Sequence, residues 1–133
     1  MKIKQSFALL AALAICSGVM ISMPAMAQKK VTLSDAEIAS VAVTANQIDI
    51  NYAAIAKEKS KNADVLRFAE TMAKDHQAVI DQAVALVTKL GVTPKDNSTS
   101  KKLLAGAAKT EKQLRLKSGD AFNKAYIDNE VAY

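Results

Sequence analysis

The side chains best suited to chemistry in this sequence are a histidine, two glutamates and a methionine on the apolar faces of predicted helices. His76 is the single histidine, and Met72 precedes it by about one helical turn on the same face. Glu111 and Glu130 each interrupt an apolar face in a later segment. Imidazole, carboxylate and thioether groups are ligands of transition metals. The candidate metal ligands are therefore His76, Glu130, Glu111 and Met72.

The same side chains also have a packing interpretation. A methionine on a helical stripe usually fills space in a core, and a histidine there usually hydrogen-bonds to a neighbouring helix. Met72 and His76 lie four residues apart and could together hold a soft metal such as copper. We expect His76 to lie inside the bundle, with Glu130 as the favoured partner of its imidazole. The sequence leaves the packing and the metal interpretations open.

No catalytic signature stands out in the sequence. Ferritin-like di-iron sites use Glu-x-x-His pairs, and Glu70, six residues before His76, falls on a different side of the helix. No serine lies in a Gly-x-Ser-x-Gly turn, and the 4 glycines form no phosphate-binding loop. The sequence therefore favours a protein that is not an enzyme and has no catalytic residues. A transition metal is the one cofactor left open.

Apolar residues recur three and four residues apart, which predicts amphipathic helices. Ser34 and Glu37 form a capping box before the first helix, and Asn62 is placed to cap the second. The first stripe expected to face the core is Ile38, Val41, Ala45, Ile48, Tyr52 and Ile55. The second is Val65, Phe68, Met72, His76, Val79, Ala83, Leu86 and Leu90.

Two further helices are expected after a turn-rich connection. Gly91 should end the second helix, and one of residues 98–100 should cap the third. Asp120 is placed to cap a fourth helix, whose apolar periodicity still runs at Tyr133. We therefore expect an all-α antiparallel helical bundle in which the fourth helix is cut short and the natural protein continues beyond this residue.

The first residues follow the order of a secretory signal peptide. Lys2 and Lys4 precede an apolar segment, residues 7–21, and Ala25-Met26-Ala27 offers the small residues of a cleavage site. The apolar segment is shorter than the roughly 20 residues that a membrane-spanning helix needs. The sequence thus predicts a signal peptide over 1–27.

The predicted mature part is a helical-bundle domain over 28–133, incomplete at its C-terminus. Cleavage would remove Cys16, the only cysteine, so disulfides and thiolate ligands are not expected. Bulky Ile15 before this cysteine disfavours a lipid anchor. The small, evenly mixed net charge excludes nucleic acid as the expected partner. We expect a periplasmic protein without a transmembrane segment in the mature chain, with association to the outer membrane left open.

Several segments resemble the exported proteins grouped as domain of unknown function 4142. These segments are 33–38, 43–49, 67–72, Asp75-His76 and 121–130. The resemblance covers nearly all of 28–133 and implies a ferritin-like helical bundle, exported or at the outer membrane, with no established activity. In the family the motif around Tyr126 continues into a histidine that would lie beyond Tyr133. The resemblance therefore implies a fold and a compartment.

Two functional hypotheses from different classes remain. The first is a non-enzymatic periplasmic protein that binds an unknown protein or envelope component, or helps the envelope to withstand stress. The alternative is a metal-binding or redox protein on a ferritin-like scaffold, in which His76 acts with carboxylates. We also expect that the unfinished fourth helix could mediate an oligomer.

Overall fold

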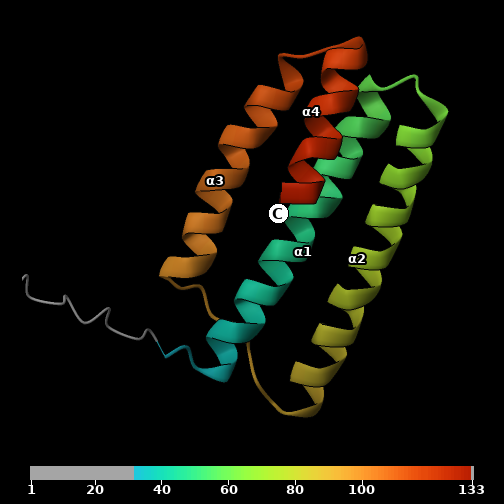
Figure 1. The fold of residues 1–133 in the computed structure, drawn as a ribbon. Helices are drawn as coiled ribbons and strands as arrows, with labels where there is room; N and C mark the ends of the chain where they lie inside the picture. The colour runs from blue at the N-terminus through green and yellow to red at the C-terminus, as the bar shows by residue number, and fades with distance from the viewer. Residues whose placement is uncertain (1–31, 133) are drawn as a thin grey trace, which may run out of the picture. The chain divides into compact units, whose positions relative to one another are not determined.

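The computed structural model describes residues 32–132, and the predicted signal peptide over 1–27 lies outside them. The described residues form a bundle of α-helices without strands, which confirms the predicted all-α fold class (Figure 1). The helices are α1 (Asp35–Lys59), α2 (Ala63–Lys89), α3 (Ser98–Arg115) and α4 (Gly119–Ala132). Among these residues, no helix combines the length and the apolar character needed to cross a membrane.

The predicted caps of α1 and α2 are confirmed. The backbone N–H of Glu37 donates to Ser34 Oγ at 3.4 Å, and the backbone N–H of Ser34 donates to Glu37 Oε2 at 3.0 Å. The backbone N–H and the hydroxyl of Ser34 both donate to the Glu37 carboxylate, and these two hydrogen bonds lower its pKa. Asn62 Oδ1 accepts from the first free N–H groups of α2, and Gly91 follows its end with a positive φ of 65°. Contacts between residues close in the sequence therefore set the start of α1 and both ends of α2.

The beginning of α3 differs from the expectation because a tertiary contact selects the cap. Asn97, rather than one of residues 98–100, is the N-cap, and its Oδ1 accepts from the backbone of Thr99 and Ser100 at 2.8 and 3.1 Å. Its Nδ2 also donates to the carbonyl of Glu37 on α1 at 3.0 Å. Asn97 thus caps one helix and fastens it to another, which residues 98–100 could not do from inside the helix.

The beginning of α4 is also shifted relative to the predicted cap at Asp120. The helix starts at Gly119, whose φ is 55°, and its backbone hydrogen bonding begins with Phe122 N donating to Ser118 O at 3.2 Å. Ser60 Oγ, at the end of α1, donates to Asn123 Oδ1 of α4 at 2.7 Å. This contact holds the start of α4 beside the end of α1. From there α4 runs back along α1 (Figure 1).

The core lies where α4 covers the other helices. Phe122 and Tyr126 of α4 are fully buried and stacked, with ring centroids 6.2 Å apart. Phe68 of α2 meets the edge of Tyr126 at 6.0 Å, and Tyr52 of α1 is buried in the same cluster. Large rings bury much apolar area, so these side chains contribute strongly to the stability of the core. The aromatic core therefore fixes where α4 sits on α1 and α2.

Part of the predicted stripes is wrong, because four residues expected in the core are exposed. Ile38, Val79, Leu86 and Leu90 have exposed fractions of 53, 46, 56 and 62%. On α2 the buried residue in this region is Ile80, one position from the expected Val79. The described part of α4 ends beside the middle of α1, so none of the described helices covers these side chains (Figure 1). Amphipathic spacing predicted a face, but burial depends on a covering helix.

Candidate functional site

Polar side chains gather inside the bundle where the end of α4 meets the middle of α1 and α2. We call this group the polar cluster. Its members are Asn46 and Asp49 of α1, His76 of α2, and Tyr126, Asn129 and Glu130 of α4. Helical spacing brings them together, because residues three or four apart share a face of a helix. The core rings of α4 continue directly into the cluster through Tyr126.

His76 is held by two side chains of α1. Its Nδ1 lies 2.7 Å from Asn46 Oδ1 and 3.5 Å from Asp49 Oδ2. The Asn46 amide is oriented by its own Nδ2, which donates to the carbonyl of Ala42 at 2.8 Å. Because Asn46 presents an acceptor, His76 Nδ1 is the donor in this contact, and Nε2 of the neutral ring is left as an acceptor.

Burial disfavours the charge of both carboxylates of the cluster, and Asp49 adds to this effect at Glu130. Burial raises the pKa of Asp49, although the neighbouring His76 acts in the opposite direction. Burial and then the Asp49 carboxylate raise the pKa of Glu130 to about 7, and the Asn129 amide opposes this shift without forming a hydrogen bond of normal geometry. Glu130 is therefore the carboxylate of the cluster whose pKa lies close to neutral pH.

Three polar atoms of α4 are buried without a hydrogen-bond partner among residues 32–132. They are Tyr126 Oη, Asn129 Nδ2 and Glu130 Oε1. Burial, followed by the charges of Glu130 and Asp49, raises the pKa of Tyr126, so its phenol stays a neutral donor. Buried polar groups in proteins almost always have partners. The cluster is thus a region of unused hydrogen-bonding capacity inside the bundle.

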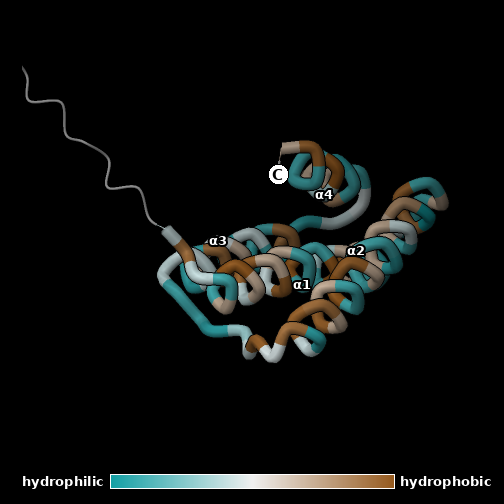
Figure 2. The backbone as a smooth tube through the Cα atoms, turned by 90° about the horizontal axis from the view of Figure 1, so that it is seen from below, coloured by the Kyte–Doolittle hydropathy of each residue, from teal (hydrophilic) through white to brown (hydrophobic). Residues whose placement is uncertain are grey.

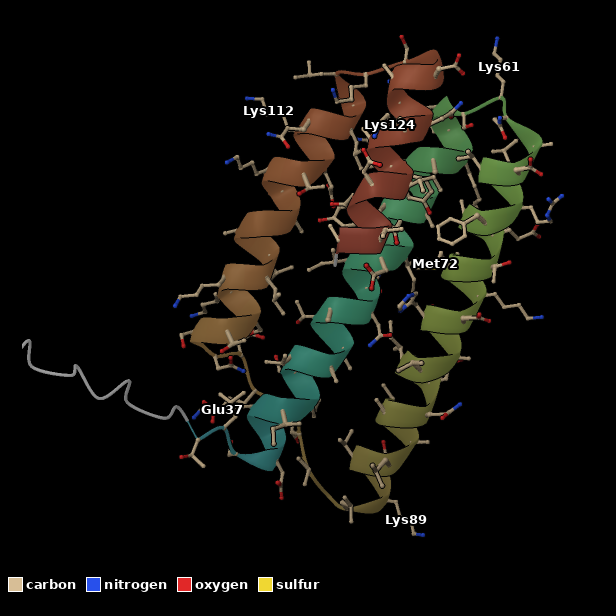
Figure 3. All side chains as sticks on the ribbon, in the orientation of Figure 1. Glu37, Lys61, Met72, Lys89, Lys112 and Lys124 are labelled. Carbon is tan, nitrogen blue, oxygen red and sulfur yellow. The ribbon has the colours of Figure 1, made fainter. Side chains whose placement is uncertain are left out.

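The predicted site residues lie in different places. His76 and Glu130 both belong to the cluster, but the predicted partner of His76 is wrong, because its imidazole contacts Asn46 and Asp49 instead. Met72 packs against the core, close to the level on α2 at which α4 ends (Figure 3). Glu111 is half-buried on α3, and no described hydrogen bond or ion pair links it to the cluster.

Metal binding by these residues stays a prediction. Within the described residues, no three His, Cys, Asp or Glu side chains are grouped as the ligands of one ion. Asp49 and His76 are adjacent, and Glu130 acts on Asp49 electrostatically. Oxygen and imidazole ligands of this kind suit divalent transition metals, provided that the side chains turn toward a common point.

Sequence reasoning missed Asn46, Asp49, Tyr126 and Asn129 as members of the site. Asp49 carried a usable signal, since it is a carboxylate flanked by Ile48 and Ile50 on a helix whose inward face is apolar. A second signal was available in the family resemblance. The segments 43–49, Asp75-His76 and 121–130, on which the resemblance rests, contain all members of the polar cluster.

The arrangement can keep Glu130 protonated near neutral pH, and its buried polar atoms can donate hydrogen bonds to a small ligand or accept them from it. No curated protein and no solved structure was found to match the chain. A family of proteins does match, over residues 21–133, and this range includes every helix that the structure describes. The chain belongs to this family, which is described as Domain of unknown function (DUF4142).

Proposed function

We propose that this chain is an exported, non-enzymatic protein of the cell envelope that binds a small ligand in the polar cluster of a ferritin-like bundle. The observation that carries the proposal is the set of buried polar atoms without partners at Tyr126, Asn129 and Glu130. Such atoms cost free energy unless something satisfies them. A ligand with hydroxyl groups could donate to Glu130 Oε1 and accept from Tyr126 Oη and Asn129 Nδ2.

The composition of the cluster supports a binding role over catalysis. His76 beside Asp49 has the groups of a general base and its orienting carboxylate. However, no serine, threonine or cysteine belongs to the cluster, so an acyl-transfer reaction has no nucleophile there. The other side chains of the polar cluster can form hydrogen bonds and carry charge, and these interactions are suited to holding a ligand.

Acid conditions are the form of envelope stress that we propose for this protein. Because the folded-state pKa of Glu130 is raised to about 7, the favoured form inside the bundle is the neutral acid. The stability that depends on this proton is fully present at low pH and is lost as the pH rises through about 7. We therefore expect acidification to raise the free energy of unfolding of the bundle.

Metal binding is the second candidate function, and one contact favours it. Asp49 Oδ2 and His76 Nδ1 lie 3.5 Å apart, next to the acid of Glu130. A divalent cation could displace the proton of Glu130 and bind the Asp49 carboxylate as well, with imidazole as a further ligand after the ring turns. This candidate extends the idea of a metal or redox protein on the same scaffold.

Native mass spectrometry of protein recovered from the periplasm of an exporting host tests both candidates. The variants are Asp49→Asn, which changes the cluster, and Asp75→Asn, which removes an exposed carboxylate next to His76 in the chain. We expect a bound small molecule in the wild type and in Asp75→Asn, and its loss in Asp49→Asn. Stoichiometric metal that a chelator removes would assign the second candidate. If each of the three proteins shows only the mass of its own unliganded chain, both candidates are contradicted.

A further inference from the structure

The two ends of the described bundle differ in charge. One end consists of the α1–α2 and α3–α4 connections with the adjoining helical turns, residues 56–66 and 112–122, and we call it the basic end. It contains six basic and three acidic residues, whereas the opposite end, residues 35–38 and 86–101, contains three of each. Outside the basic end, residues 32–132 contain eight basic and ten acidic residues. The excess of positive charge therefore belongs to the basic end.

Ion pairing leaves most cations of the basic end available to a partner. Two of its three acids are already occupied, because Glu58 pairs with Arg115 at 2.9 Å and Asp64 pairs with Arg67. The exposed lysines here that form no ion pair within residues 32–132 are Lys57, Lys61, Lys112 and Lys117. Lys61 and Lys112 both lie toward this end of the bundle (Figure 3). Such a surface complements an anionic one.

A leucine is exposed among these cations. Leu116 follows α3, between Arg115 and Lys117 in the chain, and its side chain is 79% exposed. Its position is fixed by the backbone, since its N–H donates to the carbonyl of Lys112 at 3.3 Å and that of Lys117 donates to the carbonyl of Leu114 at 3.0 Å. Cations that attract anionic headgroups, beside an apolar side chain that can enter the acyl boundary, are typical of proteins that lie on membranes.

The two connections of the basic end form one surface. Lys59 Nζ, at the end of α1, donates to the carbonyl of Arg115 at 2.9 Å, which joins this end of α1 to the end of α3. A hollow of about 530 Å³ opens between the connections. Its polar lining consists of Lys59, Lys61, Asn62, Ser118, Asp120 and Asn123. A hollow of this volume can admit the headgroup of a phospholipid.

We infer that the basic end docks on a membrane surface of anionic phospholipids. Lys57, Lys61, Lys112 and Lys117 contact the headgroup phosphates, and Leu116 enters the boundary between headgroups and acyl chains. The opposite end has no excess of charge, although the end of α2 there is largely hydrophobic (Figure 2). Docking by the basic end does not depend on the ligand proposed for the polar cluster.

The first test compares two pairs of exposed lysines in sedimentation with lipid vesicles. The exported chain should bind vesicles of equal parts phosphatidylglycerol and phosphatidylcholine, and should not bind pure phosphatidylcholine. Lys61→Gln/Lys117→Gln should weaken binding about ten- to thirtyfold, because two cations leave the contact. Lys89→Gln/Lys101→Gln removes the same charge at the opposite end and should weaken it less than about threefold. That end lies several Debye lengths from the contact, since α2 alone is about 40 Å long.

The second test compares two exposed leucines that each end a helix. Leu116→Ser should weaken binding to the mixed vesicles about three- to tenfold, because the inserted apolar side chain is lost. Leu90, the C-cap of α2 at the opposite end, is 62% exposed, and Leu90→Ser should bind as the wild type. Circular dichroism checks that all variants remain helical.

Three results would overturn the inference. The first is equal binding, or none, to the two kinds of vesicle. The second is an equal loss in both lysine pairs or in both leucine variants, which would mean that the contact is not at the basic end. The third is tighter binding to soluble polyglutamate than to the vesicles, unaffected by Leu116→Ser, which would assign the cations to an acidic protein instead.

Discussion

The two halves of the α1–α2 hairpin have similar sequence patterns but different surroundings. In the half that α4 covers, Phe122 and Tyr126 of α4 are fully buried, and Tyr126 packs against Phe68 of α2. In the other half, Leu86 and Leu90 are more than half exposed, at 56 and 62%. Both halves have apolar residues at helical spacing. The difference teaches that an amphipathic face defines where a partner can pack, whereas burial and stability come from the helix that covers it.

The largest expected difference between the halves is in core truncations. Phe122→Ala should lower the free energy of unfolding by about 3 to 5 kcal/mol, because it leaves a cavity beside Tyr126. Leu86→Ala should lower it by less than about 0.5 kcal/mol, since its side chain is already 56% exposed. Urea unfolding at concentrations at which the chain is monomeric measures both. Similar losses in the two variants would mean that the uncovered half is packed in solution.

An intermediate effect is expected for His76→Ala, at the boundary between the halves. The substitution removes the donor to Asn46 Oδ1 and the ring nitrogen nearest to Asp49. The free energy of unfolding should fall by about 1 to 3 kcal/mol, because partly buried acceptors lose their partner. Asp75→Ala, at the exposed neighbouring position, should change it by less than about 0.5 kcal/mol. An unchanged stability of His76→Ala would show that these contacts do not hold α1 to α2.

The smallest effect expected is the pH dependence contributed by Glu130 in the covered half. Its folded-state pKa is raised to about 7, so its contribution to stability is present at low pH and lost as the pH rises. Between pH 8 and pH 5 the free energy of unfolding should rise by about 1 to 2 kcal/mol, a value that allows for screening by solvent.

Unfolding of Glu130→Gln over the same pH range sharpens this prediction. In this variant most of the increase in the free energy of unfolding on acidification should be absent. The increase that remains is attributed to Asp49, whose pKa burial raises as well. Glu111→Gln, at a half-buried position on α3, is the matched control and should behave as the wild type. A wild-type stability that falls on acidification would contradict the proposed state of the cluster.

Local chemistry explains which parts of the fold could be predicted. The capping box of Ser34 and Glu37, the Asn62 cap and the turn at Gly91 depend on atoms a few residues apart, so sequence spacing was sufficient. The cap of α3 was missed because Asn97 is chosen by its hydrogen bond to the carbonyl of Glu37, which lies far away in the sequence. Caps with tertiary partners cannot be read from spacing alone.

The candidate site was likewise predictable only in part. The sequence identified His76 and Glu130 as polar groups on apolar faces, because helical periodicity fixes the side of a helix on which a residue lies. It could not choose the partner of His76. The partner depends on the position of α2 along the axis of α1. In the structure this position places Asn46 and Asp49 beside the imidazole.

By itself, the sequence determined that this protein forms amphipathic helices, where two of them begin and end, and which faces are apolar. These features follow from propensities and from contacts within one or two helical turns. Only the tertiary structure decided that α4 covers one half of the hairpin, that Ile80 rather than Val79 is buried, and that Asp49 lies near enough to Glu130 to raise its pKa. Those outcomes arise from the relative placement of helices, which a pattern of residues along one helix does not specify.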